Sequence, residues 1–345
     1  MECYQRFTSL VLFHSKRCKS KEILFSRWPF LIRSQYFSEH THSFRPSSHN
    51  ENPQRSLRVA VVGPPNSGKS SLTNQLVSAQ VSAVSSRMDT TQRNVVAAVT
   101  VENRQLVFVD SPGTVSIQHA RNIVKDKCDR ILMDPERAVE RADYIIVLHD
   151  ATATGDYIHH RVLHLLHRYQ HLPSSLVINK VDLVKRRCDL LPLINILCNG
   201  QVGGQKVQLS KARVGRLGQL GAAGHRSKDS LNPNELDSIR DQYWQEKYRN
   251  VMQKPIEKVS WSETKHLFIN IRGWSKFDAV FLTSSCSGEG IESLKEHLLN
   301  QSIVREHTFT SSTVTTKNPQ AICQDAVRAK LLDNLPADVA YRLQV

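Results

Sequence analysis

The chain has 345 residues and a formal net charge of +14, with 46 lysines and arginines against 32 aspartates and glutamates. Its hydrophobic content of 40% suits the packed core of a globular protein with one large domain or two ordinary ones. No apolar run reaches the roughly 20 residues of a membrane-spanning helix, and the scattered cysteines argue against a zinc site or a disulfide framework. The excess of positive charge favours an acidic partner, such as nucleic acid or an anionic membrane surface.

Residues 1–50 differ in composition from the rest of the chain. They contain eight basic and three acidic residues, with serines scattered throughout. This composition is typical of a mitochondrial transit peptide and predicts a location in the mitochondrial matrix. A basic leader without a targeting role is the alternative.

From residue 57 onward, short β-branched runs alternate with amphipathic stretches. The predicted strands are residues 58–62, 95–101, 105–109, 144–148, 175–178 and 279–282. The predicted helices are residues 69–76, 120–133, 156–169, 190–197 and 290–299. Alternating strands and helices imply an α/β fold with a doubly wound, mostly parallel sheet, which we expect to span residues 57–304.

The first strand ends in a glycine-rich loop with a P-loop signature. Its residues are Gly63, Pro64, Pro65, Asn66, Ser67, Gly68, Lys69 and Ser70, followed by Ser71. They match GxxxxGK[ST] between a predicted strand and a predicted helix, where backbone N–H groups can bind phosphate oxygens. In a P-loop NTPase, Lys69 reaches the β and γ phosphates and the Ser70 hydroxyl ligates Mg²⁺.

Two further segments are expected to act on Mg²⁺ and the γ-phosphate. Asp110 ends an apolar strand and is expected to project toward the Mg²⁺ held by Ser70, while Gly113 turns its amide toward the γ-phosphate. A threonine in the loop after the first helix can complete the Mg²⁺ shell with GTP bound and leave it after hydrolysis. We assign this role to Thr91 rather than Thr90, and two ordinary surface threonines are the alternative.

Two loops are expected to select the base. The Asp182 carboxylate can accept hydrogen bonds from N1–H and the 2-amino group of guanine, and adenine offers neither donor there, so GTP and GDP are the predicted ligands. Asn179 is expected to orient this loop, and the stem of Lys180 to cover the base. Near the end of the domain, Ser284 and Ser285 can offer a backbone N–H to guanine O6. An ordinary surface turn is the alternative for both loops.

Two stretches break the alternation. Residues 200–261 are rich in Gly, Lys, Arg and Gln and have weak apolar periodicity, which predicts a basic insertion on the surface rather than part of the core. Residues 305–318 are predicted to be a linker to a last helix at 319–333, which needs something to pack against. Its apolar side holds Ile322, Ala326, Ala329 and Leu332.

In this order the motifs resemble the TrmE-Era-EngA branch of translation-associated GTPases, above all Era in its mitochondrial form. The resemblance runs from about residue 57 to the end and rests on residues 63–70, Thr90 and Thr91, 110–113 and 179–182, supported by 132–135 and 330–336. It implies a Ras-like G domain that binds GTP or GDP with Mg²⁺ and hydrolyses GTP slowly. It also implies an RNA chaperone or assembly factor that acts on small-subunit ribosomal RNA and, in mitochondria, on the small mitoribosomal subunit.

The resemblance also bears on catalysis, for which Asn66, Lys69, Thr91 and Gly113 are the expected residues. Thr114 stands where Ras-like GTPases place a water-orienting glutamine. In the resembling families, the asparagine at Asn66 helps to hold a monovalent cation such as K⁺, which does some of an arginine finger's work. A GTP-loaded scaffold with negligible turnover is the alternative, and the guanine motif argues against a third possibility, an ATP enzyme.

Era proteins carry a C-terminal KH domain, which grips RNA backbone with a GxxG loop between two helices. Residues 319–345 resemble the start of that domain, and no later segment supplies its loop, so a truncated KH domain is expected. The GxxG matches between Gly215 and Gly224 lie in the insertion, where a flexible linker is the preferred interpretation. The expected partners are small-subunit ribosomal RNA and the small mitoribosomal subunit, bound by a monomer, with peripheral contact to the inner mitochondrial membrane left open.

Overall fold

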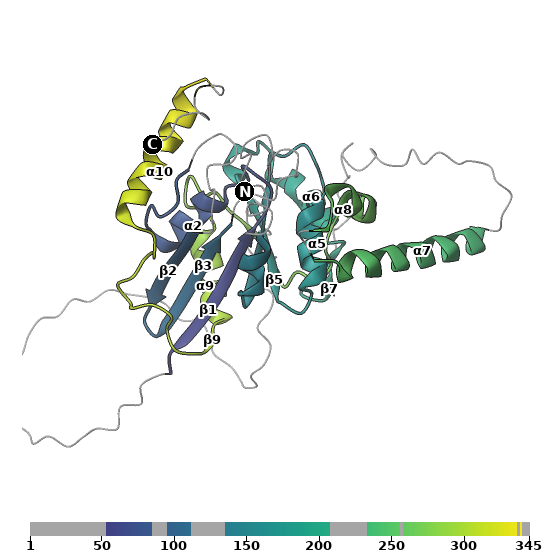
Figure 1. The fold of residues 1–345 in the computed structure, drawn as a ribbon, viewed down its shortest axis with the longest axis horizontal. Coiled ribbons are helices and arrows are strands. Elements are labelled where there is room, and N and C mark those ends of the chain that lie inside the picture. The colour runs from purple at the N-terminus through teal and green to yellow at the C-terminus, as the bar shows by residue number, and fades with distance from the viewer. Residues whose placement is uncertain are drawn as a thin grey trace, which may run out of the picture.

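The structure is a computed structural model that describes residues 53–84, 95–111, 135–207, 233–255, 258–336 and 339, with only the backbone for 233–241. Figure 1 shows a twisted sheet with helices on both faces and one long helix, α7, that projects from the side. The expectations for the leader at 1–50, the helix at 120–133 and the GxxG matches fall outside the described residues.

One seven-stranded sheet forms the centre of the fold. In spatial order its main strands are β2 (Val95–Val101), β3 (Arg104–Asp110), β1 (Arg55–Val62), β4 (Tyr144–Asp150), β5 (Ser174–Asn179) and β8 (Ala279–Leu282). The last five of these run parallel, and β2 runs antiparallel to β3, to which it is joined by a short turn. This arrangement confirms the predicted α/β class with a mostly parallel sheet.

Helices cover both faces of the sheet (Figure 1). On one face lie α2 (Lys69–Val77) and α9 (Ile291–Asn300). On the other face lie α5 (His160–Arg168), α6 (Leu190–Leu197) and α8 (Trp261–Phe268). The fold is therefore doubly wound, as predicted.

β1 shows how the two faces are formed, because successive side chains of a strand point to opposite sides. Val59 and Val61 join the apolar cluster of α2 and α9, whereas Ala60 and Val62 join the cluster of α5, α6 and α8. All four side chains are fully buried. A strand covered on both faces has an almost continuous apolar sequence, which is why β1 could be recognised without alternation.

The strand register brings polar residues to one edge of the sheet. Val61 of β1 pairs with Asp110 of β3, and Asp150 of β4 pairs with Asn179 of β5. Because these strands are parallel, their carboxyl ends lie at the same edge, where ligands of open α/β sheets bind. The loop that starts at Gly63 leaves β1 at this edge.

The helix expected at residues 156–169 is shorter than predicted. α5 begins only at His160, because the N–H of Ile158 donates to the carbonyl of Arg272 at 2.8 Å and the Arg272 guanidinium pairs with Asp156 at 3.0 Å. These contacts with another segment hold residues 156–158 outside the helix.

The prediction of a surface insertion at residues 200–261 is wrong for its C-terminal part. α7 (Pro233–Gln253) packs Trp244, Tyr248, Val251 and Met252 against the cluster of α5 and α8. Their spacing puts them on one side of the helix, so its end joins the core. Polar residues between them weakened this periodicity in the sequence.

A short hairpin and the helix α8 were not predicted. β6 (Gln201–Val202) and β7 (Gln205–Lys206) form a short hairpin. α8 begins with a capping box, in which the Ser260 hydroxyl accepts a hydrogen bond from the Glu263 N–H at 3.1 Å and the Glu263 carboxylate accepts one from the Ser260 N–H at 2.8 Å. This pair is a helix start signal that the sequence did contain.

The predicted linker is bound to the β2–β3 hairpin, and a short strand before it joins the sheet. β9 (Ile303–Val304) pairs with the start of β1. The fully buried amide of Gln105 then donates to the carbonyl of Phe309 at 2.8 Å and accepts hydrogen bonds from the N–H groups of Thr308 and Phe309 at 2.9 and 3.0 Å. The segment before the last helix therefore follows the β2–β3 hairpin and is not a free tether.

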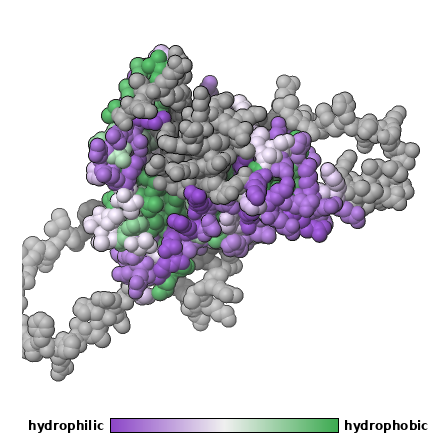
Figure 2. Space-filling view, viewed as in Figure 1, coloured by the Kyte–Doolittle hydropathy of each residue, from purple (hydrophilic) through white to green (hydrophobic). Residues whose placement is uncertain are grey.

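The last helix is α10 (Pro319–Asn334), close to its predicted bounds. Ala329 and Leu332 are buried as expected, whereas Ala326 is exposed and Val327 is 49% exposed. Figure 2 shows apolar surface on this helix.

Among the described residues, none of the helices combines the length and apolar character needed to span a bilayer.

Candidate nucleotide site

Two glycines fix the path of the loop between β1 and α2. A Cβ atom at Gly63 would lie 2.7 Å from the carbonyl oxygen of Leu148 in β4. Gly68 has a φ of +93°, and a Cβ atom there would lie 2.2 Å from the Asn179 amide nitrogen. The loop therefore passes so close to β4 and β5 that both ends require glycine.

Lys69 is the first residue of α2 and is only 7% exposed. Its ammonium donates to the carbonyl oxygens of Pro64 at 2.9 Å and Gly63 at 3.3 Å. The Ser67 hydroxyl also donates to the Pro64 carbonyl, at 2.9 Å. These bonds hold the ammonium over the loop, where phosphates lie in P-loop proteins.

The other predicted P-loop residues lie around this ammonium. Pro64 and Pro65 are half-buried, as are Ser70 and Ser71 in the first turn of α2. Asn66 is exposed and has a φ of +60°, in the left-handed region that asparagine tolerates.

Asp110 is the last residue of β3 and is fully buried. Within the described residues, neither of its carboxylate oxygens has a hydrogen-bond partner. Burial raises the pKa of Asp110, and the nearby Ser70 hydroxyl, Lys69 ammonium and Ser82 hydroxyl offset part of that increase. Because Mg²⁺ prefers oxygen ligands and would compensate the buried charge, Asp110 and Ser70 fit this ion.

The loop after α2 is held by a buried side chain that the sequence did not single out. The Asn74 amide oxygen accepts hydrogen bonds from the N–H groups of Val81 and Ser82, both at 3.0 Å. Its amide nitrogen donates to the Ser82 carbonyl at 2.8 Å. Asn74 thereby fixes Ser82 beside Asp110.

Asn179 connects the phosphate loop to the predicted base loop. Its amide nitrogen donates to the Ser67 carbonyl at 3.0 Å, and its amide oxygen accepts from the N–H and the hydroxyl of Ser285, both at 3.0 Å. The Ser284 N–H donates to the carbonyl of Glu289 at 3.0 Å. The expected orienting role of Asn179 has a clear geometric basis, but the N–H groups of Ser284 and Ser285 are already engaged by the protein.

Lys180 and Asp182 follow Asn179 at the mouth of the site. The Lys180 ammonium donates to Asp150 at 2.6 Å, and Asp182 is exposed. Burial alone would raise the pKa of Asp150, but the hydrogen bonds from Lys180 and Thr152 outweigh this effect and hold that pKa below its ordinary value. Asp150 was missed in the sequence, although a polar residue that ends an apolar strand was a usable signal.

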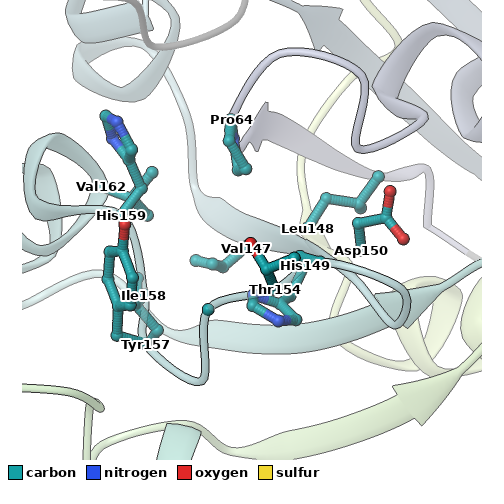
Figure 3. A pocket seen from close by; sticks show the side chains of 12 residues that line it. Pro64, Val147, Leu148, His149, Asp150, Thr154, Tyr157, Ile158, His159 and Val162 are labelled. Carbon is teal, nitrogen blue, oxygen red and sulfur yellow. The ribbon is translucent and has the colours of Figure 1, made fainter.

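A separate cavity of about 180 Å³ lies next to the P-loop. Figure 3 shows Pro64 on one side of it and His149, Asp150 and Tyr157 around it. Burial lowers the pKa of His149, whose Nε2 has no hydrogen-bond partner in the described part of the chain. The volume is below the roughly 300–1,000 Å³ of ligand sites.

The remaining predicted residues of the site are Thr90, Thr91, Gly113 and Thr114, and they lie outside the described residues.

Comparisons with known proteins bear on this arrangement. Residues 58–180 match a family model described as 50S ribosome-binding GTPase. The chain is 49% identical over 294 residues to a Caenorhabditis elegans protein named GTPase Era, mitochondrial, a match that covers 84% of this chain and 73% of that protein. It is 32% identical over 292 residues to a Danio rerio protein of the same name, a match that covers 84% of this chain and 60% of that protein.

Two solved structures share the fold, each with a TM-score of 0.53. One is Era in complex with MgGDPNP and nucleotides 1506–1542 of 16S ribosomal RNA, 19% identical, with 83% of this chain and 70% of that one covered. The other is Aquifex aeolicus Era bound to GDP and AlF4⁻, 18% identical, with 84% and 70% covered.

Proposed function

The chain belongs to the Era family of GTPases, which bind GTP or GDP with Mg²⁺ and hydrolyse GTP, and we propose that it is a slow, partner-stimulated switch on small-subunit ribosomal RNA in mitochondria. The observation that carries this proposal is the position of Asn179, which ties the phosphate loop to the base loop through Ser67 and Ser285. One side chain thus sets the distance between the two ends of a bound nucleotide.

The base is selected at Asp182. Its carboxylate accepts hydrogen bonds from guanine N1–H and the 2-amino group, and with adenine it would face no donor. The exposed fraction of Asp182 is high in the protein alone, and a bound base would itself exclude water from the carboxylate. Selectivity for guanine then follows from donor and acceptor matching.

The phosphates and the metal occupy the buried half of the site. Lys69 neutralises phosphate charge, and Ser70 and Asp110 hold Mg²⁺, which stabilises the charge on the transferred phosphoryl group when bound. With GTP bound, Thr91 would complete the metal shell and Gly113 would contact the γ-phosphate, so both residues would respond to hydrolysis.

Turnover is slow because Thr114 replaces a water-orienting glutamine. Asn66 is exposed at the turn of the P-loop, a position from which its side chain can help to hold K⁺ near the phosphates. This cation and the RNA partner together raise the rate of hydrolysis.

Several observations support an RNA partner in mitochondria. One solved Era relative holds 16S ribosomal RNA, two relatives are named mitochondrial, and the chain has a net charge of +14. The protein acts as a monomer in the matrix on the small mitoribosomal subunit, and peripheral contact with the inner membrane is left open. The chain spans 73% of the nematode relative and 60% of the zebrafish relative, so the activity of those longer proteins is part of the proposal.

Single-turnover hydrolysis by the full chain tests the proposal. We expect slow cleavage of bound GTP that a small-subunit ribosomal RNA fragment accelerates and that is faster in K⁺ than in Na⁺. Asn66→Ala is expected to remove the difference between the two cations. A chain that binds GTP but cleaves none, with or without RNA, is instead a GTP-loaded scaffold.

A further inference from the structure

A bidentate ion pair joins the two loops on the base side of the site. Arg187 lies in a short 3-10 helix, Arg187–Asp189, five residues after Asp182, and Glu289 lies in the loop between β8 and α9. The two guanidinium nitrogens donate to the two carboxylate oxygens at 2.5 and 2.7 Å. These residues are 102 positions apart in the chain, so the contact is purely tertiary.

Glu289 is tightly connected to the base loop. Its carbonyl accepts the hydrogen bond from the Ser284 N–H at 3.0 Å, and the next residue, Gly290, has a φ of +73°. A Cβ atom at Gly290 would lie 2.1 Å from the Leu282 carbonyl oxygen, so the backbone has little freedom there. A displacement of Glu289 is therefore expected to move Ser284 and Ser285 as well.

Arg187 is connected in the same way to the loop of Asp182. One backbone bond already links the two loops near the sheet, from the Val181 N–H to the Thr283 carbonyl at 3.2 Å. The hydrogen bonds from Ser285 to Asn179 also join the loops near the sheet, and the ion pair adds a link between side chains that are 43% and 40% exposed. An exposed pair can open without a large desolvation change, and a bidentate geometry makes it stronger than most surface pairs.

We propose that Arg187 and Glu289 form a latch over the guanine side of the site that slows nucleotide release. This inference rests on the proposed function, because it requires a guanine nucleotide between the loops of Asp182 and Ser285. The base leaves when these loops separate, and the latch holds them together. In this proposal both residues act through the loops of Asp182 and Ser285, so both are positioning residues.

A neighbouring ion pair offers a matched control. Arg186 and Asp189 lie in the same segment at 3.4 Å, with exposed fractions of 75% and 47%, but they join residues of one loop only. If any loss of charge in this segment accelerated release, Arg186→Glu would do so as well. The latch predicts that it does not.

The test is the dissociation rate of N-methylanthraniloyl-GDP from the full chain, chased with excess GDP, for the wild type, Arg187→Glu, Glu289→Arg, the double charge swap and Arg186→Glu. We expect about two- to fivefold faster release from each single latch variant, the factor that an exposed ion pair supplies. We expect wild-type release within about twofold from the double swap, because reversed charges restore the pair, and from Arg186→Glu. High salt should reduce the differences.

Unchanged release from the single latch variants would overturn the latch, as would a double swap that releases as fast as they do. Thermal melting of each variant separates faster release from loss of folding. A wild-type chain that binds no labelled GDP would overturn the proposed function together with the latch. Tight GDP binding with no effect of the latch variants would overturn the latch alone.

Discussion

The site has a phosphate half, formed by the P-loop and Asp110, and a base half, formed by the loops of Asp182 and Ser285. The two halves differ in how deeply their functional side chains are buried. Lys69, Ser67 and Asp110 are buried, and the first two are held by hydrogen bonds within the loop. Asp182 and Arg187 are exposed and Glu289 is half-buried, and their geometry depends on side chains at the surface. Substitutions in the buried half should therefore cost both stability and affinity, whereas substitutions in the exposed half should cost affinity alone.

Asn179→Ala should have the largest effect, because this residue belongs to both halves. It removes the bonds to the Ser67 carbonyl and the Ser285 N–H, which lie in buried surroundings. We expect the free energy of unfolding to fall by about 2–4 kcal/mol and the affinity for GTP to fall roughly 100-fold or more. Urea unfolding and GTP titration measure the two losses.

Asn103→Ala is the control for that substitution, since the Asn103 side chain makes an exposed hydrogen bond to the Pro53 carbonyl. It should change neither quantity by much. An equally stable Asn179→Ala variant would contradict the role of Asn179 as the connection between the halves.

Asp182→Asn should change base recognition without changing stability. The amide cannot accept both guanine hydrogen bonds but can donate to the 2-oxo group of xanthine, so affinity for GTP should fall roughly 100-fold while affinity for XTP rises. The thermal midpoint should stay within about 2 °C, because Asp182 is exposed. Competition titrations with GTP and XTP provide the measurement, with Asp189→Asn in the same segment as the control.

Asn74→Ala should lower both the stability of the protein and its retention of GDP, because Asn74 holds the loop beside Asp110. Losing the bonds to Val81 and Ser82 leaves buried backbone groups unpaired, at a cost of about 1–3 kcal/mol in unfolding free energy. Because Ser82 lies beside Asp110, we also expect more Mg²⁺ to be needed to retain GDP. Gln75→Ala, on the exposed side of the same helix, should leave both unchanged.

A residue distant from either half is expected to affect stability alone. Burial, helped by Arg168 and Arg161, lowers the pKa of His164 on α5 to about 3, and within the described residues neither ring nitrogen has a hydrogen-bond partner. The unfolded chain binds this proton at a pKa of about 6.5, so stability is full above pH 6.5 and is lost as the pH falls toward 3. The slope from this group is at most about 1.4 kcal/mol per pH unit.

His164→Leu should reduce that slope, as measured by urea unfolding between pH 7 and pH 4.5. The exposed His171→Gln is the matched control and should keep it. An unchanged slope in His164→Leu would mean that other groups cause the acid sensitivity.

The sequence was informative wherever one local pattern implied one structure. The buried strands appear as apolar runs, and Gly63 and Gly68 mark turns that tolerate no side chain. Asp110 and Asn179 follow such strands directly, so their place at one edge of the sheet could be derived before any coordinates.

The features that the sequence did not predict depend on contacts between distant segments. Nothing local to Gln105 indicates that its amide binds the backbone of Thr308 and Phe309, and nothing near Arg187 points to Glu289. The buried end of α7 was missed for a related reason, since its apolar stripe is completed only where it meets α5 and α8. The Ser260 capping box, in contrast, was a local signal that could have been used.

Competition of unlabelled GTP and ATP for the full chain loaded with fluorescent GDP, in the presence of Mg²⁺, tests the central claim most directly. The account predicts that GTP displaces the label at concentrations at least roughly 1,000-fold lower than ATP, because only guanine satisfies Asp182. Equal displacement by the two nucleotides would contradict it and would mean that the loops joined by Asn179 do not read the base.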